Sequence, residues 1–198
     1  KYLVYFCAMS SHHIIREKQE PALLIISLDN FDHEHLGQLL EWSPSVIVSD
    51  KLYEITDSMG IKIDGVLTTD GDNHVEIQSN TQVITTGPDQ LEDALKFLIS
   101  EEYPAVNIIT NEFHTKDYTL FTDFIDLVIY NGNKKIFPVR PGFSKWKPAR
   151  EKVELLQEVT ELQTANLKHI EPAVFETEKD GFYTLIFEQP VIFIAEDF

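Results

Sequence analysis

Apolar runs alternate with amphipathic stretches along the first 140 residues of the chain. Residues 22–28 (ALLIISL) form a continuous apolar run directly after Pro21, which is typical of a strand buried on both faces. Residues 35–42 carry leucines at helical spacing, and Pro44 ends that stretch. A short β-branched run follows at residues 46–48. This strand–helix–strand order predicts the beginning of a parallel sheet.

A second helix is expected immediately after this β-branched run. It opens at Ser49, and its apolar residues Leu52, Ile55 and Met59 recur at positions i, i+3 and i+7. Gly60 stands where a helix commonly ends in a left-handed residue. The pattern therefore predicts a short helix between two strands.

An acidic turn follows the second of these strands. Apolar residues within 61–67 predict the strand, which runs into residues 69–73 (TDGDN). Open α/β folds bind ligands beyond the carboxyl ends of their strands, so Asp70 and Asp72 are expected at a ligand-binding edge. Mg²⁺ prefers oxygen ligands and is usually held by one or two carboxylates. The same residue types are ordinary turn formers, so the tip alone fits both a metal site and a simple turn.

Further elements continue the alternation. The clearest is a helix that Asp89 can cap, with Glu92 in the capping-box position. Alternating strands and helices predict an α/β fold with a mostly parallel sheet flanked by helices. The remaining elements expected before residue 140 are a strand around 83–84, the helix over 89–101, a strand over 104–110, a long apolar helix over 117–130 and a strand over 135–139.

The pattern changes after Pro141. Short apolar runs separated by turn residues follow, with a hairpin signal at residues 179–181 (KDG). They predict a small antiparallel, β-sandwich-like domain. We therefore expect an α/β domain over residues 11–140 and a C-terminal β domain over residues 141–198. A unit as small as the second supports only a marginal core, so we expect it to pack on the first domain or on a second subunit.

The chain is strongly acidic, with a formal net charge of −17 from 33 acidic and 16 basic residues. Such a surface is unsuited to nucleic acid and to anionic membranes, both of which need basic patches. No apolar run reaches the roughly 20 residues that a membrane helix requires. Cys7 is the single cysteine, which excludes an internal disulfide and a cysteine-based zinc site and fits a reducing compartment. We expect a cytoplasmic protein that binds neither nucleic acid nor membrane.

Residues 46–73 resemble the central motif of the thiamine pyrophosphokinases. In that family a strand–Asp-Gly-Gly–helix unit is followed by a helix ending in Gly-Ile-Lys, a strand, and then Gly-Asp-x-Asp-Ser. The resemblance continues from about Ser11 to the C-terminus. The matching segments of this chain are Ser49-Asp50-Lys51, Met59-Gly60-Ile61-Lys62 and Thr69-Asp70-Gly71-Asp72-Asn73.

The resemblance implies a homodimeric enzyme that transfers diphosphate from ATP to thiamine with Mg²⁺ as cofactor. It assigns Asp70 and Asp72 as metal ligands and catalytic residues. Asp89 would supply a further catalytic carboxylate, although it is equally explained as a helix cap. The residues expected on the nucleotide side are Asp50, Asn73, Asp117 and Thr119.

The family pattern is interrupted at four places that serve one reaction. Lys51-Leu52 replaces two small glycines, and the Thr-Asp expected before the helix over 89–101 is missing. Glu112 and Phe113 occupy the loop that would face the phosphates, and Tyr118 replaces a histidine. The Ser-Asn strand pair of the tail is absent. These departures support an alternative hypothesis, in which the chain is a catalytically inactive relative that acts as a ligand-binding or dimerising module.

One feature is independent of the family. Seven of the 16 basic residues lie within 134–152. Such a cluster is typical of a solvated strand edge guarded by lysines, or of a surface that meets an anionic ligand or a second subunit. Phe143 and Trp146 within it favour an interface. The seven residues are Lys134, Lys135, Arg140, Lys145, Lys147, Arg150 and Lys152.

Overall fold

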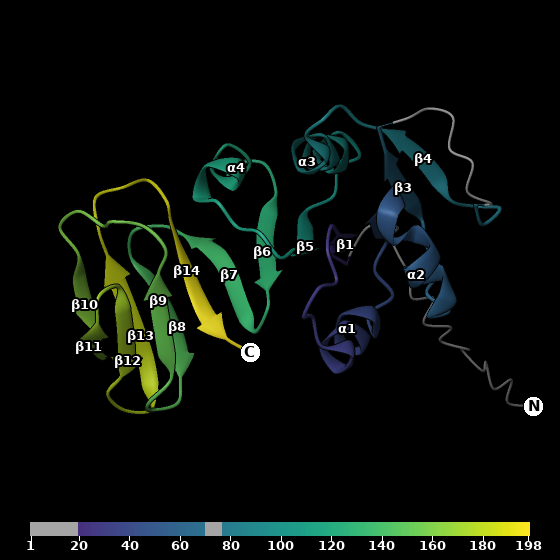
Figure 1. Cartoon of the computed structure of the whole chain (residues 1–198). Helices are drawn as coiled ribbons and strands as arrows, with labels where there is room; N and C mark the ends of the chain where they lie inside the picture. The colour runs from purple at the N-terminus through teal and green to yellow at the C-terminus, as the bar shows by residue number, and fades with distance from the viewer. Residues whose placement is uncertain (1–19, 70–76) are drawn as a thin grey trace, which may run out of the picture.

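The computed structural model describes residues 20–69 and 77–198 (Figure 1). Asp70, Asp72 and Asn73 lie outside the described residues. Within the described chain, the strands form an 11-stranded sheet and a separate three-stranded sheet. Their order in the large sheet is β11-β12-β9-β14-β7-β6-β5-β1-β2-β3-β4. The same part of the chain contains no helix long and apolar enough to cross a membrane.

Parallel strands make up one half of the large sheet, as the alternating sequence pattern predicts. Strand order reverses between β1 and β5, because β1 lies between β2 and β5. This reversal creates the switch point beyond which open α/β folds bind ligands. The parallel strands are β1 (Ala22–Ile25), β2 (Val46–Ser49), β3 (Gly65–Thr68), β4 (Gln82–Thr85), β5 (Ala105–Ile109) and β6 (Asp126–Asn131).

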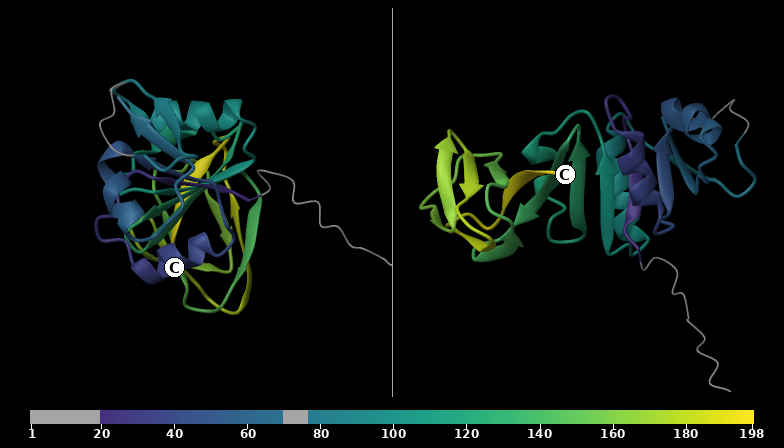
Figure 2. Two further views of the ribbon diagram at one scale, coloured as in Figure 1. Left: turned by 90° about the vertical axis from the view of Figure 1, so that its right-hand side faces the viewer. Right: turned by 90° about the horizontal axis from the view of Figure 1, so that it is seen from below.

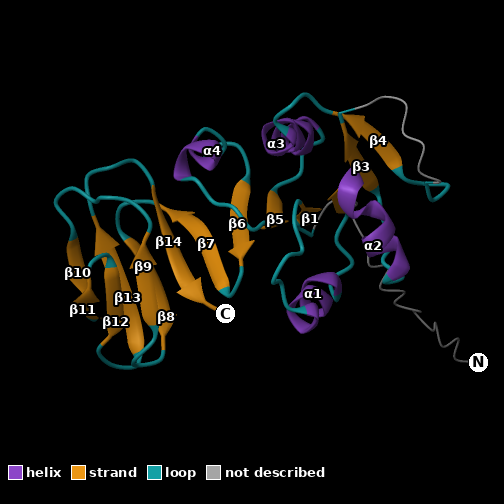
Figure 3. Ribbon diagram, viewed as in Figure 1, coloured by secondary structure: helices purple, strands orange, loops and turns teal. Residues whose placement is uncertain are grey.

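Helices pack on both faces of this parallel half. The helices α1 (His33–Leu40) and α2 (Tyr53–Ser58) bury apolar side chains on one face, and a 3₁₀ turn, η1 (Asp50–Leu52), precedes α2. The helices α3 (Gln90–Ser100) and α4 (Thr115–Thr119) pack on the other face. Figure 3 shows the two pairs on opposite sides of the strands.

The buried face of α2 differs from the prediction. Ile55 and Met59 are exposed, whereas Tyr53 and Thr56 are buried. The reason lies in the 3₁₀ turn that precedes the helix. Because a 3₁₀ turn has three residues per turn rather than 3.6, it rotates the following helix relative to a continuous α-helix that begins at Ser49. The helical end at Gly60 is confirmed, since its φ is 73°.

The long helix predicted over residues 117–130 is wrong. The helix α4 ends at Thr119, turns follow over residues 120–125, and β6 begins at Asp126. Leu120 and Phe124, which belong to the assumed apolar stripe, are exposed. The buried side chains instead alternate along the chain, which is the period of a strand. They are Ile125, Leu127 and Ile129.

Antiparallel strands form the other half of the large sheet. The sheet is continuous across residue 140, because β7 pairs with β6 on one side and with β14 on the other. Figure 2 shows the parallel and antiparallel halves at opposite ends of the molecule. The strands of this half are β7 (Lys134–Val139), β9 (Lys152–Leu155), β11 (Leu167–Glu171), β12 (Val174–Thr177) and β14 (Ile192–Asp197).

The three-stranded sheet contains β8 (Phe143–Lys147), β10 (Gln163–Ala165) and β13 (Gly181–Ile186). Its side chains and those of the antiparallel half share one apolar core, so the region is sandwich-like, as expected. The hairpin expected at residues 179–181 is wrong, because β12 belongs to the large sheet and β13 to the small one. The turn therefore connects two sheets.

Candidate functional site

A pocket of about 490 Å³ opens beyond the carboxyl ends of β1, β2 and β3. Its position follows from the parallel sheet, whose carboxyl ends lie at one edge. The lining combines residues that follow these strands with the first residues of α3. They are Ile26, Asp50, Lys51, Thr69, Pro88, Asp89, Gln90 and Leu91. The structure therefore brings together Asp50 and Asp89, two of the residues predicted from sequence, in one pocket.

Asp50 is positioned at the start of the 3₁₀ turn that follows β2. Its Oδ1 atom accepts a hydrogen bond of 2.8 Å from the backbone N–H of Lys51, which orients the carboxylate. Lys51 itself is exposed and also lines the pocket. The sequence showed Lys51 only as a replacement for glycine. Because Lys51 directly follows Asp50 in the sequence, its positive charge could have been expected at this edge of the sheet.

Asp89 caps α3, as the capping-box pattern predicts. Its Oδ1 atom accepts a hydrogen bond of 3.0 Å from the N–H of Glu92. A second carboxylate, Asp93, accepts from the N–H of Gly87 at 2.7 Å and fixes the loop before the helix. Asp89 remains exposed at the rim of the pocket. One side chain thus caps the start of the helix and lines the pocket at the same time.

Asp117 and Thr119 lie on α4, and neither is among the described residues that line this pocket. The Oγ1 atom of Thr119 donates to the carbonyl of Thr115 at 2.8 Å, within its own helix. Asp117 and Asp89 both lie near the buried side chain of Tyr118. Burial raises the pKa of Tyr118, and the two nearby carboxylates raise it further. The carboxylates of Asp117 and Asp89 therefore act on the same buried ring.

The loop that follows β5 is held in place by hydrogen bonds and aromatic contacts within the protein. The hydroxyl of Thr110 accepts from the N–H of Glu112 at 3.2 Å and lies 3.2 Å from the carbonyl of the same residue. Phe113 turns toward the core, where its ring stacks on Tyr118 with centroids 5.2 Å apart. It also meets Phe193 edge-on at 5.5 Å. The backbone N–H of Glu112 is therefore already bonded within the protein.

The pocket offers oxygen donors of the kind that Mg²⁺ prefers. Asp50 and Asp89 supply carboxylates, and Thr69 is the last described residue before the acidic tip that contains Asp70 and Asp72. Among the described residues, no three His, Cys, Asp or Glu side chains form a group that could hold a metal ion. A complete magnesium site here would therefore need the carboxylates of the tip.

Four of the seven basic residues within 134–152 form ion pairs. Lys134 pairs with Asp197 at 2.8 Å and Arg140 with Asp123 at 2.6 Å. Lys145 and Lys147 both contact Glu196. Most of this cluster is therefore neutralised by carboxylates of the same chain. In the described ranges 20–69 and 77–198 no ion pair is found to Lys135, Arg150 or Lys152, and only Lys135 of these three is half-buried.

Comparison with known proteins identifies the fold. No family model matches the sequence, and no curated protein does. A protein from Lactobacillus plantarum superposes with a TM-score of 0.67 at 11% identity, over 90% of this chain and 99% of that one. Thiamine pyrophosphokinase from Bacillus subtilis gives 0.58 at 13% identity, over 90% and 99%. Thiamin pyrophosphokinase from Candida albicans gives 0.63 at 9% identity, over 90% and 89%. The chain therefore has the fold of the thiamine pyrophosphokinases.

Proposed function

We propose that the chain transfers diphosphate from ATP to thiamine at the pocket beyond β1, β2 and β3. The observation that carries the proposal is the lining of this pocket. Asp50 and Asp89 face it from separate elements, and its described wall ends at Thr69, next to Asp70. The similarity of the whole fold to proteins named thiamine pyrophosphokinases supports the proposed choice of substrates.

In the proposed reaction the hydroxyl oxygen of thiamine attacks the β-phosphorus of ATP. A bond forms between these two atoms, and the bond from the β-phosphorus to the oxygen shared with the α-phosphorus breaks. That oxygen leaves with AMP, and the proton of the thiamine hydroxyl is lost to solvent or to a carboxylate. Such transfers depend on positioning and on electrostatic stabilisation more than on covalent catalysis.

Three charged residues of the pocket have a role in this proposal, and Asp50 moves to the metal from the nucleotide side, where the resemblance placed it. Asp50 and Asp89, together with Asp70 and Asp72, would hold Mg²⁺, which when bound offsets the negative charge of the phosphates. The ammonium of Lys51 would attract the nucleotide into a pocket of an otherwise acidic protein. The proposal also keeps Asn73, Asp117 and Thr119 on the nucleotide side.

The test is to incubate the purified protein with ATP, Mg²⁺ and thiamine and to measure AMP by chromatography. We expect AMP to form only when thiamine is present, and Asp72→Ala to abolish it. Asp126→Ala is the matched control, since it removes an exposed carboxylate from the start of β6. If a folded protein forms no AMP and calorimetry detects neither thiamine nor a non-hydrolysable ATP analogue, the proposal is wrong. Binding without AMP would assign the pocket to a non-catalytic module.

The proposal includes a homodimer. An apolar patch on the outer face of the small sheet supports it. Trp146 and Phe182 are cross-strand partners on β8 and β13, and Ile186 lies on the same face of β13. All three are about half exposed or more. Exposed apolar groups of this kind mark association surfaces. Sedimentation should show a dimer that Phe182→Asp shifts toward monomer, whereas Phe124→Asp, at another exposed phenylalanine, should not.

A further inference from the structure

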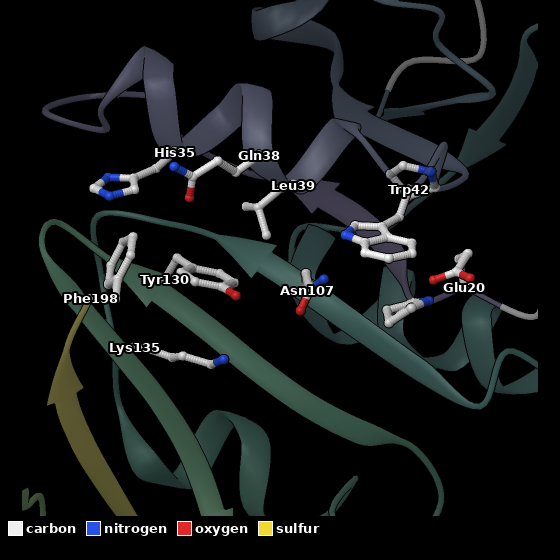
Figure 4. Close-up of a pocket in the computed structure, with 11 residues that line it drawn as sticks. Glu20, His35, Gln38, Leu39, Trp42, Asn107, Tyr130, Lys135 and Phe198 are labelled. Atoms are coloured by element: carbon white, nitrogen blue, oxygen red, sulfur yellow. The ribbon is translucent and has the colours of Figure 1, made fainter. Parts of the chain in front are cut away.

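A second pocket, of about 530 Å³, lies beneath α1 on a face of the parallel sheet (Figure 4). It has no lining residue in common with the pocket proposed for diphosphate transfer. The apolar face of α1 joins one cluster with side chains of β1 and β2, and Ile109 of β5 and Tyr130 of β6 belong to the same cluster. Side chains from β5, β6 and β7 line the pocket next to α1 and form its floor.

The floor carries hydrogen-bond donors in an otherwise apolar face. Asn107, Tyr130 and Lys135 come from β5, β6 and β7, and Tyr130 and Lys135 are partners in the strand register. Figure 4 shows the hydroxyl of Tyr130, the amide of Asn107 and the ammonium of Lys135 below α1, around one open space. Such convergent polar groups on an apolar surface are the usual anatomy of a small-molecule site.

Lys135 forms no ion pair in the described chain, where the ring of Tyr130 lies 6.0 Å from its Nζ atom. Burial lowers the pKa of Lys135, Lys145 lowers it further, and Glu196 only partly opposes the effect. Leaving a half-buried cation without a carboxylate is unfavourable. An anion bound at the floor would remove that cost.

The opposite wall is aromatic. Trp42 follows α1 and is 70% exposed, an unusual state for an indole. His35 and Phe198 are packed together at the other end, with ring centroids 4.6 Å apart. A planar ring inserted between Trp42 and the floor would cover apolar surface on both sides. Glu20 lines the Trp42 end, away from Lys135, and disfavours a second negative group there.

We infer that this pocket binds a small planar aromatic molecule carrying one anionic group, with the ring against Trp42 and the anion at Lys135, Tyr130 and Asn107. The anion is a carboxylate or a phosphate, since both accept from an ammonium, a hydroxyl and an amide. This binding is separate from the transfer of diphosphate to thiamine. It requires neither Mg²⁺ nor the acidic tip.

The test uses the fluorescence of Trp42 in the full chain, with Trp146→Phe removing the only other tryptophan. The probes are 4-nitrobenzoate, 4-nitrophenyl phosphate and neutral 4-nitrobenzyl alcohol, whose nitroaromatic rings quench indole emission. We expect saturable quenching by at least one anion and a tenfold or greater loss of affinity in Lys135→Met. The stronger anion identifies a carboxylate or a phosphate site. Lys152→Met, an exposed lysine of β9, is the control and should keep the affinity.

Two results would overturn the inference. One is quenching that rises linearly with probe concentration or is equal for the neutral probe. The other is equal affinity in Lys135→Met. Calorimetry with Trp42→Ala gives an independent readout, because Trp42 is exposed and its removal leaves the core intact. The preferred anion should then lose most of its binding heat. Unchanged heat would place the binding elsewhere.

Discussion

The hydroxyl of Tyr183 donates a hydrogen bond of 2.8 Å to Oε1 of Glu196, and both side chains are buried. The bond joins the small sheet to the large one, because Tyr183 lies on β13 and Glu196 on β14. The other carboxylate oxygen, Oε2, contacts the ammonium groups of Lys145 and Lys147. Burial raises the pKa of Tyr183 and Glu196 raises it further, so the donor proton stays in place at neutral pH.

Tyr183→Phe removes this donor and leaves the ring in the core. We expect a loss of about 2 kcal/mol in the free energy of unfolding, because the lost hydrogen bond ends on a charged acceptor. Urea unfolding followed by circular dichroism measures it. A loss below the error of the extrapolation would show that the bond contributes nothing net.

Glu196→Gln keeps the shape of the side chain and removes the charge shared by Lys145 and Lys147. We expect a larger loss, of about 3 kcal/mol, because Glu196 and Lys147 are both buried and the change removes the carboxylate that Lys147 shares with the partly exposed Lys145. Lys147 has Glu151 as a second partner at 3.4 Å, so Lys145 is the cation left alone. The double variant Glu196→Gln with Lys145→Met should recover part of the loss. Failure to recover any would exclude charge as the cause.

Tyr118→Phe is the counterpart of Tyr183→Phe at a hydroxyl that has no partner among the described residues. Tyr118 is almost fully buried. Removing a buried hydroxyl without a hydrogen bond should leave stability unchanged or raise it by up to about 1 kcal/mol. The two variants belong in one urea experiment. A loss at Tyr118 equal to that at Tyr183 would reveal a hidden partner.

Two substitutions at Asp89 separate its role as a helix cap from its proposed role in catalysis. Asp89→Ala should lower stability by about 1 kcal/mol, because it removes the acceptor for the N–H of Glu92. Asp89→Asn keeps an acceptor there and should change stability little. If the carboxylate acts in the proposed reaction, AMP formation should nevertheless fall at least tenfold in Asp89→Asn. Activity equal to that of the wild type would leave Asp89 as a cap only.

Lys135→Met should stabilise the protein at neutral pH, and the gain should shrink as the pH rises. Burial lowers the pKa of Lys135 in the folded state, so between that pKa and the ordinary value of 10.5 the unfolded chain binds the extra proton. Stability of the wild type therefore rises with pH across this window, whereas the variant lacks that contribution. Unfolding midpoints at pH 7, 8, 9 and 10 measure the difference. A gain that does not depend on pH would contradict this account.

The parallel half of the fold could be predicted because its central strands are buried on both faces and read as apolar runs. β1, β2 and β3 are the clearest cases, with every residue buried, whereas the edge strand β4 is mostly exposed. The helix α3 was predictable for a local reason, since Asp89 and Glu92 lie three residues apart, at the two ends of one capping box. Both signals depend only on residues close together in the sequence.

The segment after α4 could not be assigned in the same way. Leu120 and Phe124 fit a helical stripe, and only the exposure of both in the structure shows that the stripe is not used. The strand β8 was missed because its inward side chains include Lys147, whose burial depends on Glu196 some fifty residues later. Local pattern cannot show such a distant partner.

The candidate site was predicted in part. The carboxyl edge of the sheet followed from strand order, and Asp50 and Asp89 lie there together. The pocket beneath α1 was not predicted, because Asn107 and Lys135 become neighbours only through the pairing of β5, β6 and β7. The one available indication in the sequence was Trp42, because the apolar pattern of the helix does not account for an indole at this position.

The position of β14 has a consequence for how the chain folds. Residues 192–197 insert between β7 and β9, so β7 is joined to the rest of the antiparallel half only through a strand made long after it. Until it arrives, one edge of β7 presents unpaired backbone groups, a site at which foreign strands can add. Closure across so long a loop is entropically slow. The nascent chain is thus most prone to aggregate between the synthesis of β7 and that of β14, when a chaperone would protect it best.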